Sequence, residues 1–184
     1  MFASLDALTA DLLAPRHLGW LLDGWLTTLW STCLVVIAAT VLGCVYAAAR
    51  ESGRPLWVRV TGVYLSIFRN TPLLVQLFFW YFGVTALLPE GLVAWLNQIH
   101  AISLAGVEIV RWPSFEFLSA IVGLVFYSTA YVGEDLRSGL KGVPRGQREA
   151  AKALGLRPWQ VMRRVILPQA LAIATAPLLG QYMN

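Results

Sequence analysis

Residues 143–168 read VPRGQREAAKALGLRPWQVMRRVILP, and this stretch decides the interpretation of the chain. Pro144 suits a first helical position, and the residues after it are good helix formers as far as Leu154. Gly155 stands where a left-handed C-terminal cap is expected. Pro158 then opens a second helix, because proline is favoured at a first helical position. The sequence therefore predicts two short helices joined by a tight glycine turn.

The first of these helices has about eleven residues, a length that is marginal for an isolated helix in water. We therefore expect a partner to dock against it. Small side chains allow close approach of another backbone, which suits insertion of the helix into a partner's groove. The helix carries a basic stripe at i, i+3 and i+7, which consists of Arg145, Arg148 and Lys152. On another side it has a small apolar face, which consists of Ala150, Ala153 and Leu154.

The composition excludes an ordinary soluble domain. Apolar residues make up 58% of the 184 residues, charged residues make up 13%, and the mean hydropathy is +0.64. Soluble domains carry about 25% charged residues, so lipid must be the solvent for much of this chain. Cys33 and Cys44 are separated by about 16 Å along one helix, which is too far for a disulfide. The sequence also lacks metal-ligand spacing.

Apolar stretches predict four membrane-spanning helices, at about 24–49, 60–89, 116–135 and 165–184. Continuous apolar runs without strand-like alternation argue against a β-barrel. We therefore expect an all-α membrane protein. Its parts would be an external N-terminal tail, 1–23, and one transmembrane domain, 24–184. The last span stops at Asn184 with no anchor after it, which suggests an incomplete chain.

Basic residues are distributed unevenly between the two sides of these spans. The segment between the first two spans and the loop 136–164 together hold eleven Lys and Arg, whereas the opposite side holds only Arg16 and Arg111. Cytoplasmic loops carry such an excess. The N-terminus is therefore expected outside and residues 136–164 in the cytoplasm. This topology explains the net charge of +4, so nucleic acid is not expected as a partner.

Glu149-Ala150-Ala151, Gly155, Val165 and Leu167-Pro168 resemble the EAA loop of binding-protein-dependent importer permeases. That pattern has an isoleucine where this chain has Val165, the one departure. The resemblance implies that the loop docks into a cleft of a cytoplasmic ATPase and transmits its closure on ATP. The alternative is an ordinary amphipathic hairpin at the membrane surface. The residues that the resemblance assigns to coupling are Glu149, Ala150, Ala151, Leu154, Gly155, Leu167 and Pro168.

Two further stretches narrow the resemblance to permeases of polar amino-acid importers. They are residues 65–83, LSIFRNTPLLVQLFFWYFG, with Asn70 in a position usually held by glycine, and residues 131–151, YVGEDLRSGLKGVPRGQREAA. The resemblance implies the type I importer fold in a bacterial inner (plasma) membrane. Members of this kind have five spanning helices, so the fifth would lie beyond Asn184.

The resemblance also implies the partners of the chain. These are a cytoplasmic ATP-binding-cassette ATPase dimer, a second permease subunit, an external or periplasmic amino-acid-binding protein and membrane lipid. The chain has no G-x-x-x-x-G-K phosphate loop. It is therefore expected to be no enzyme and to bind no cofactor, with ATP and Mg held by the ATPase. The alternative is a secondary transporter or channel subunit, which would be expected to place acidic pairs or broken helices at the midplane.

A helix break is expected at Arg69-Asn70-Thr71-Pro72. A helix that starts at membrane depth presents N–H groups suited to a substrate carboxylate. Arg69, Asn70, Thr71, Pro72 and Gln76 are therefore candidates for the translocation path. The alternative, which we favour, places residues 60–68 along the cytoplasmic interface, where the Arg69 side chain can reach water.

Two other segments carry smaller expectations. Glu134 and Asp135 follow the third span and are expected to form an ion-pair network with Arg137 rather than to line a path. The loop 89–116 carries apolar residues at helical spacing. It is expected to hold a short interfacial helix that could meet a binding protein.

Overall fold

The computed structural model describes residues 15–98, 101–104, 107–111 and 114–183. Contacts divide the chain into two units, Met1–Val35 and Val36–Asn184. In the first unit the described residues are the N-terminal turns of α2 (Pro15–Glu51), and many of their large apolar side chains are exposed. Exposed apolar surface of this extent is typical of a segment covered by lipid or protein.

The start of α2 differs from the expected boundary of the N-terminal tail. The tail was expected to end at residue 23, but residues 15–23 are helical. Pro15 suits a first helical position, and Asp23 interrupts only the apolar run, because a single charged residue does not break a helix. Residues 1–14 of the expected tail lie outside the described residues.

The second predicted span is divided into two helical segments. α3 (Pro55–Asn70) ends before Thr71 and Pro72, whose backbones are extended, with ψ of 129° and 141°. A residue before proline is disfavoured in the helical region, and proline itself lacks an N–H. The helix resumes as α4 (Leu73–Phe78), a π-helical turn η1 (Phe79–Gly83) and α5 (Val84–Leu87). The stretch 60–89 is therefore not one continuous helix.

The loop between α5 and the next long helix contains both helix and strand. The short helix expected within 89–116 is present as α6 (Glu90–Leu96). β1 (Ala101–Leu104) and β2 (Val107–Arg111) form an antiparallel pair that the sequence analysis did not predict. The strands are rich in β-branched residues, which favour extended structure. This hairpin is a local addition to a helical fold.

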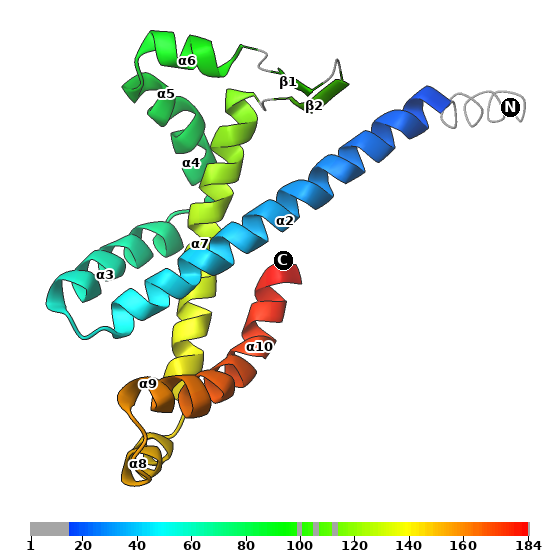
Figure 1. The fold of residues 1–184 in the computed structure, drawn as a ribbon. Helices are drawn as coiled ribbons and strands as arrows, with labels where there is room; N and C mark the ends of the chain where they lie inside the picture. The colour runs from blue at the N-terminus through cyan, green and yellow to red at the C-terminus, as the bar shows by residue number, and fades with distance from the viewer. Residues whose placement is uncertain (1–14, 99–100, 105–106, 112–113, 184) are drawn as a thin grey trace, which may run out of the picture. The chain divides into compact units, whose positions relative to one another are not determined.

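α7 (Phe115–Gly142) is the element on which the second unit is built, and it contacts α3, α4 and α10 (Figure 1). The Ser114 side chain caps its start by accepting a hydrogen bond from the Phe117 N–H at 3.4 Å. Small residues let α7 approach its neighbours closely. A buried cluster joins it to α2 and α10 and consists of Ala47, Val132, Leu136 and Ala174.

The C-terminal part is α8 (Arg145–Ala153), α9 (Pro158–Val161), a π-helical turn η2 (Met162–Ile166) and α10 (Leu167–Met183). α9, η2 and α10 form one helical path from Pro158, so this helix starts before the predicted residue 165. α7 likewise continues to Gly142, inside the predicted loop 136–164.

Among the described residues, three helices are long and apolar enough to cross a membrane, namely His17–Glu51, Phe115–Gly142 and Pro158–Met183. The remaining predicted span corresponds to the shorter apolar helix Leu73–Leu87. These helices agree with the predicted class, a helical membrane protein.

Candidate functional site

The turn between α8 and α9 has the glycine geometry that the sequence predicted. Gly155 has a φ of +78°, a conformation that L side chains rarely adopt. Its N–H donates to the Lys152 carbonyl at 2.9 Å, and the Leu156 N–H donates to the Ala151 carbonyl at 3.2 Å. This pair of hydrogen bonds is a Schellman motif, which satisfies the last carbonyls of α8. Pro158 is the first residue of α9, as expected.

α8 is attached to the rest of the second unit by a small apolar contact. Ala151 is 4% exposed and is the only buried residue of this nine-residue helix. It packs in a cluster with Val143, Val161, Ile166 and Ala170. One side chain the size of a methyl group buries little apolar area, so this contact contributes little stability.

The opposite face of α8 is exposed. Glu149, Ala150 and Ala153 are exposed, and Leu154 is 82% exposed. Trp159 of α9 adds a further exposed apolar side chain close in sequence to the turn. An exposed apolar face next to a carboxylate is suited to docking in a groove of another protein.

The residues that the resemblance assigned to coupling thus fall into three groups. Ala151 is internal and holds α8 in place. Glu149, Ala150 and Leu154 are exposed on α8 and its C-terminus, and Gly155 forms the turn. Leu167 and Pro168 are exposed but belong to the first turn of α10, beyond the π-helical turn.

The helix break at residues 71–72 is closed by Gln76. Its Nε2 donates to the Phe68 carbonyl at 2.9 Å and to the Thr71 carbonyl at 2.8 Å. Gln76 is 6% exposed, and its Oε1 is buried without a hydrogen-bond partner in the described structure. The break borders a hollow of about 290 Å³ lined chiefly by apolar side chains, among them Trp80. The Gln76 side chain on α4 therefore bonds to backbone carbonyls on the other side of the break and stabilises its geometry.

Arg69 stands at the end of α3 and faces α7. Its guanidinium carbon lies 5.2 Å from the centre of the Tyr131 ring, within cation–π distance. Arg69 and Asn70 are both exposed, and the Asn70 amide donates to the Ser66 hydroxyl at 3.2 Å. This geometry is compatible with both sequence interpretations, a place beside a path and a place at the interface.

A charge cluster joins α2 to α7, and only part of it was predictable from the sequence. Glu134 accepts a hydrogen bond from the Tyr46 hydroxyl at 2.7 Å and pairs with Arg137 at 3.1 Å and Arg50 at 3.5 Å. Arg137 also pairs with Glu51 at 3.0 Å. The expected pairing of Glu134 with Arg137 is confirmed, whereas Asp135, which was expected in the same network, forms no ion pair with the described residues. The adjacent opposite charges of Arg50 and Glu51 at the end of a span are the sequence feature that could have indicated the remaining ion pairs of this cluster.

The described residues contain no group of three or more His, Cys, Asp or Glu that could hold a metal ion. Cys33 and Cys44 are both free and exposed. His100 lies outside the described residues.

Comparison with known families gives a match over most of the chain. The sequence model of the family described as "Binding-protein-dependent transport system inner membrane component" matches residues 39–184. A solved structure described as "Crystal structure of an amino acid ABC transporter with histidines" matches with a TM-score of 0.70 and 28% identity. That match covers 91% of this chain and 68% of the solved one.

Curated relatives are similar over a large part of this chain. The arginine transport system permease protein ArgU of Corynebacterium glutamicum is 41% identical over 152 residues, which cover 83% of this chain and 45% of that protein. The glutamate/aspartate import permease protein GltJ of Escherichia coli (strain K12) is 31% identical over 169 residues, 91% of this chain and 64% of that protein. The chain thus spans about half to two thirds of the length of these relatives.

Proposed function

Because this chain belongs to the family of binding-protein-dependent transport inner membrane components, we propose that it is the permease subunit of an ATP-driven importer for polar amino acids. The substrate class is supported by the names of two relatives, one for arginine and one for glutamate and aspartate. ATP and Mg would be bound by a separate ATPase dimer. This chain would form part of the translocation path and would couple to that ATPase.

The observation that carries the coupling proposal is the construction of α8. Ala151 is the one buried side chain of this helix, and Glu149, Ala150 and Leu154 are exposed. A short helix with a free apolar face can enter a cleft on the ATPase and follow it when the cleft closes on ATP. The Gly155 turn fixes where this helix ends, so movement of α8 would pass through α9 to α10.

The proposed topology places the α8–α9 turn in the cytoplasm and the N-terminus outside. The distribution of Lys and Arg supports this orientation. The segment with α6 and the hairpin would then face an external amino-acid-binding protein, and a second permease subunit would complete a central path. Lipid would cover the exposed apolar side chains that face neither partner.

A place in the translocation path is the less favoured of the two interpretations of the helix break, and we propose the experiment that decides between them. Arg69, Asn70, Thr71, Pro72 and Gln76 surround the point at which α3 ends and α4 begins. Arg69 offers a positive charge to a substrate carboxylate. Uptake by Arg69→Gln tests this role, with Arg59→Gln on the same helix as the charge-matched control. Equal uptake by both variants and the wild type would remove Arg69 from the path.

The coupling proposal is tested by co-purification of the ATPase and by ATP-dependent uptake. Glu149→Lys and Gly155→Asp should both lose ATPase association and uptake. Gln147→Lys, an exposed change on the same helix, is the control and should retain both. Undiminished association and uptake in the first two variants would disprove coupling through α8. Uptake that persists without ATP would instead favour the secondary transporter or channel.

A further inference from the structure

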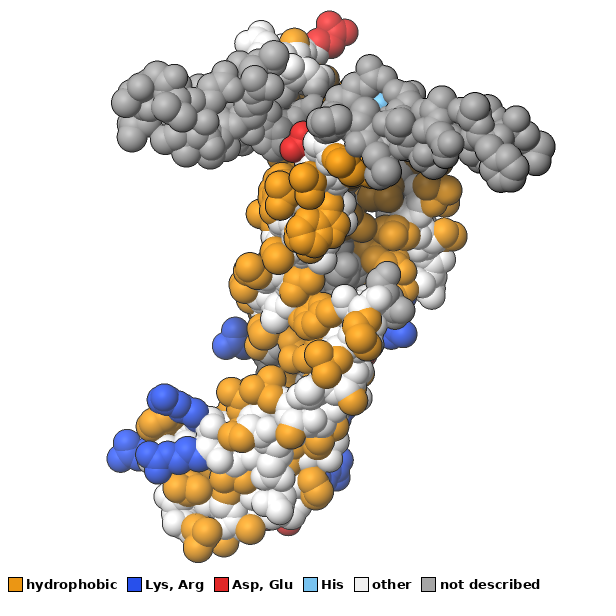
Figure 2. Space-filling view, turned by 90° about the vertical axis from the view of Figure 1, so that its right-hand side faces the viewer, with side chains coloured by type: hydrophobic (Ala, Val, Ile, Leu, Met, Phe, Trp, Pro, Cys, Tyr) orange, Lys and Arg blue, Asp and Glu red, His pale blue; other side chains and the backbone are white. Residues whose placement is uncertain are grey.

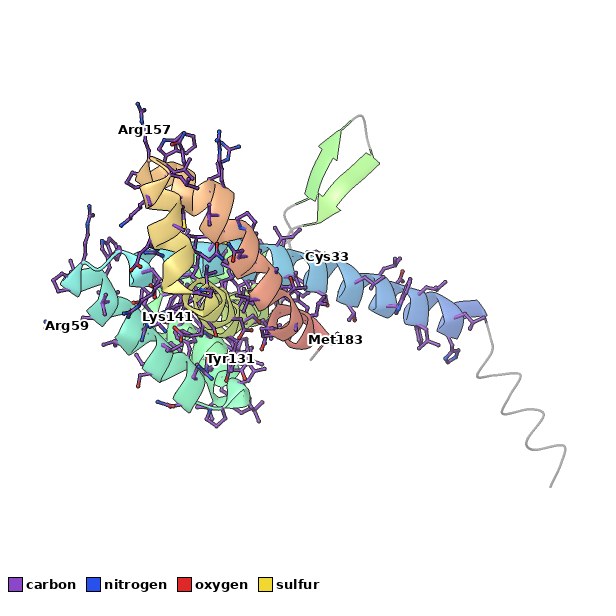
Figure 3. The ribbon with its side chains drawn as sticks, turned by 90° about the horizontal axis from the view of Figure 1, so that it is seen from below. Cys33, Arg59, Tyr131, Lys141, Arg157 and Met183 are labelled. Atoms are coloured by element: carbon purple, nitrogen blue, oxygen red, sulfur yellow. The ribbon has the colours of Figure 1, made fainter. Side chains whose placement is uncertain are left out.

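A cleft of about 570 Å³ lies between α8 and the ends of α2 and α7. Its charged lining is strongly basic and consists of Lys141, Arg145, Arg148 and Lys152, with two carboxylates, Glu51 and Glu149. Lys141, close to the end of α7, is labelled in Figure 3. Glu149, one of the residues proposed to meet the ATPase, lines this cleft, whereas Leu154, Gly155 and Trp159 of the exposed turn are not among its lining residues.

The charges in this cleft do not cancel. Glu51 is already paired with Arg137 at 3.0 Å, which leaves Glu149 as the one free carboxylate of the lining. The four cations make no ion pair with any residue that the structure describes. The first turn of α8 has neither an acidic residue nor a side-chain cap, so the positive end of its dipole is also uncompensated. The cleft is therefore suited to an anion.

The position of the cleft indicates where the anion comes from. α2 and α7 are both long and apolar enough to cross a membrane, and the cleft lies where each of them ends. Headgroups of phospholipids occupy this level, and basic pockets between spanning helices on the cytoplasmic side bind anionic headgroups. In Figure 2 the blue Lys and Arg side chains lie on the lower part of the molecule, on the face shown.

We propose that this cleft binds the phosphate of an anionic phospholipid, phosphatidylglycerol or cardiolipin. The proposal rests on the cytoplasmic orientation proposed above for this end. Leu140 and Val143 supply an apolar wall beside the cations, which suits the first methylene groups of a lipid's acyl chains, and a soluble anion has no such groups. A bound headgroup would bridge α7 and α8, so it would influence the resting position of a helix whose one buried side chain is Ala151.

The test is lipid binding by the purified full chain in detergent micelles, followed by native mass spectrometry. The probes are dioleoylphosphatidylglycerol and dioleoylphosphatidylethanolamine. The wild type should prefer phosphatidylglycerol. Each cation near an anionic headgroup contributes about five-fold in binding, so the double variant Arg145→Gln/Arg148→Gln should bind it about 25-fold more weakly. Arg163→Gln/Arg164→Gln removes the same charge outside the cleft and should bind as the wild type does.

Three results would overturn the proposal. The first is the absence of a preference in the wild type, a comparison that needs no variant. The second is an equal loss in both double variants, which would indicate general surface charge. The third is displacement of phosphatidylglycerol by glycerol 3-phosphate, which would indicate a site for a soluble phosphate.

An ATPase surface as the occupant is distinguished by co-purification. If the double variant at Arg145 and Arg148 keeps its phosphatidylglycerol preference but loses the ATPase, the cleft meets an acidic protein surface and the lipid proposal is wrong. Because lipid binding is measured on this chain alone, a failure here leaves the importer proposal intact. A failure of ATP-dependent uptake likewise leaves the lipid result standing.

Discussion

Within the second unit, α7 is tightly packed against its neighbours, whereas α8 is attached by a small contact. α7 meets α10 so closely that a Cβ on Gly139 would overlap the Ala170 carbonyl. It meets α2 equally closely, because a Cβ on Gly133 would overlap the Tyr46 ring. α8 buries only Ala151. The first arrangement resists separation of its helices, whereas the second can be displaced at low cost. The importer proposed above would need both, because a rigid helix would move as a body and a docking helix would follow its partner.

Polar contacts follow the same division. The Thr40 and Tyr182 hydroxyls lie 2.6 Å apart and join α2 to α10, and the Glu134 cluster joins α2 to α7. Among the residues that the structure describes, the charged side chains of α8 form no ion pair. The difference predicts that changes in the packed region act on the whole unit, while changes in α8 act locally.

The largest effect is expected for Gly139→Leu. A Cβ at this position would lie 2.9 Å from the Ala174 Cβ in addition to its overlap with the Ala170 carbonyl, so α7 and α10 must separate. Overpacking of this kind costs about 3 kcal/mol, and the thermal midpoint in detergent should fall sharply. Gly180→Ala on α10, where a Cβ meets nothing within 4 Å, is the control and should not lower it. An unchanged midpoint for Gly139→Leu would show that this helix contact is loose.

A smaller effect is expected for Glu134→Gln. The Glu134 side chain is 19% exposed and contacts Tyr46, Arg50 and Arg137, so its neutralisation leaves two guanidinium groups without their shared carboxylate. The cost should be about 2 kcal/mol. Glu51→Gln removes a single, more exposed ion pair and should cost less than about 1 kcal/mol. Thermal unfolding of both variants, repeated at high salt, measures the difference, and equal losses would contradict a central role for Glu134.

Ala151→Asp should have a local effect. A carboxylate in the cluster of Val143 and Ile166 has no partner there, so α8 should detach rather than bury it. Detachment is expected to cost about 1.5 kcal/mol, seen as a more than ten-fold faster amide exchange in 145–153. Ala150→Asp, on the exposed side of the same helix, is the control and should leave this exchange unchanged. Equal amide exchange in 145–153 for both variants would contradict the local role of Ala151.

The same contrast explains what the sequence could predict. The α8–α9 turn was predictable because Pro144, Gly155 and Pro158 act on their own backbone and need no distant residue. The break at Thr71 and Pro72 was predictable for the same reason. The membrane-spanning class followed from composition, whereas the orientation stays a prediction from the distribution of Lys and Arg.

Features that depend on distant contacts were not predictable. Nothing near Glu134 in sequence indicates that Arg50, 84 positions earlier, shares its carboxylate. The hydrogen bonds from the Gln76 amide to the carbonyls of Phe68 and Thr71 across the break were not predicted either, and the place of Gln76 in the path stays a prediction. The early start of α2 was not predicted because the apolar run begins only at residue 24, whereas the helix itself begins at Pro15.

The smallest effect is expected for Gly155→Ala, and it tests whether the turn itself sets the position of α8. At a φ of +78° a Cβ meets no neighbour, so the cost is backbone strain alone, about 1 kcal/mol. Gly146→Ala, inside the same exposed helix and also free of neighbours, should instead gain up to about 1 kcal/mol of helix stability. Amide exchange in α8 should therefore become faster in the first variant and slower in the second. Changes of the same sign in both would show that exchange in α8 reports its docking at Ala151 and not the turn.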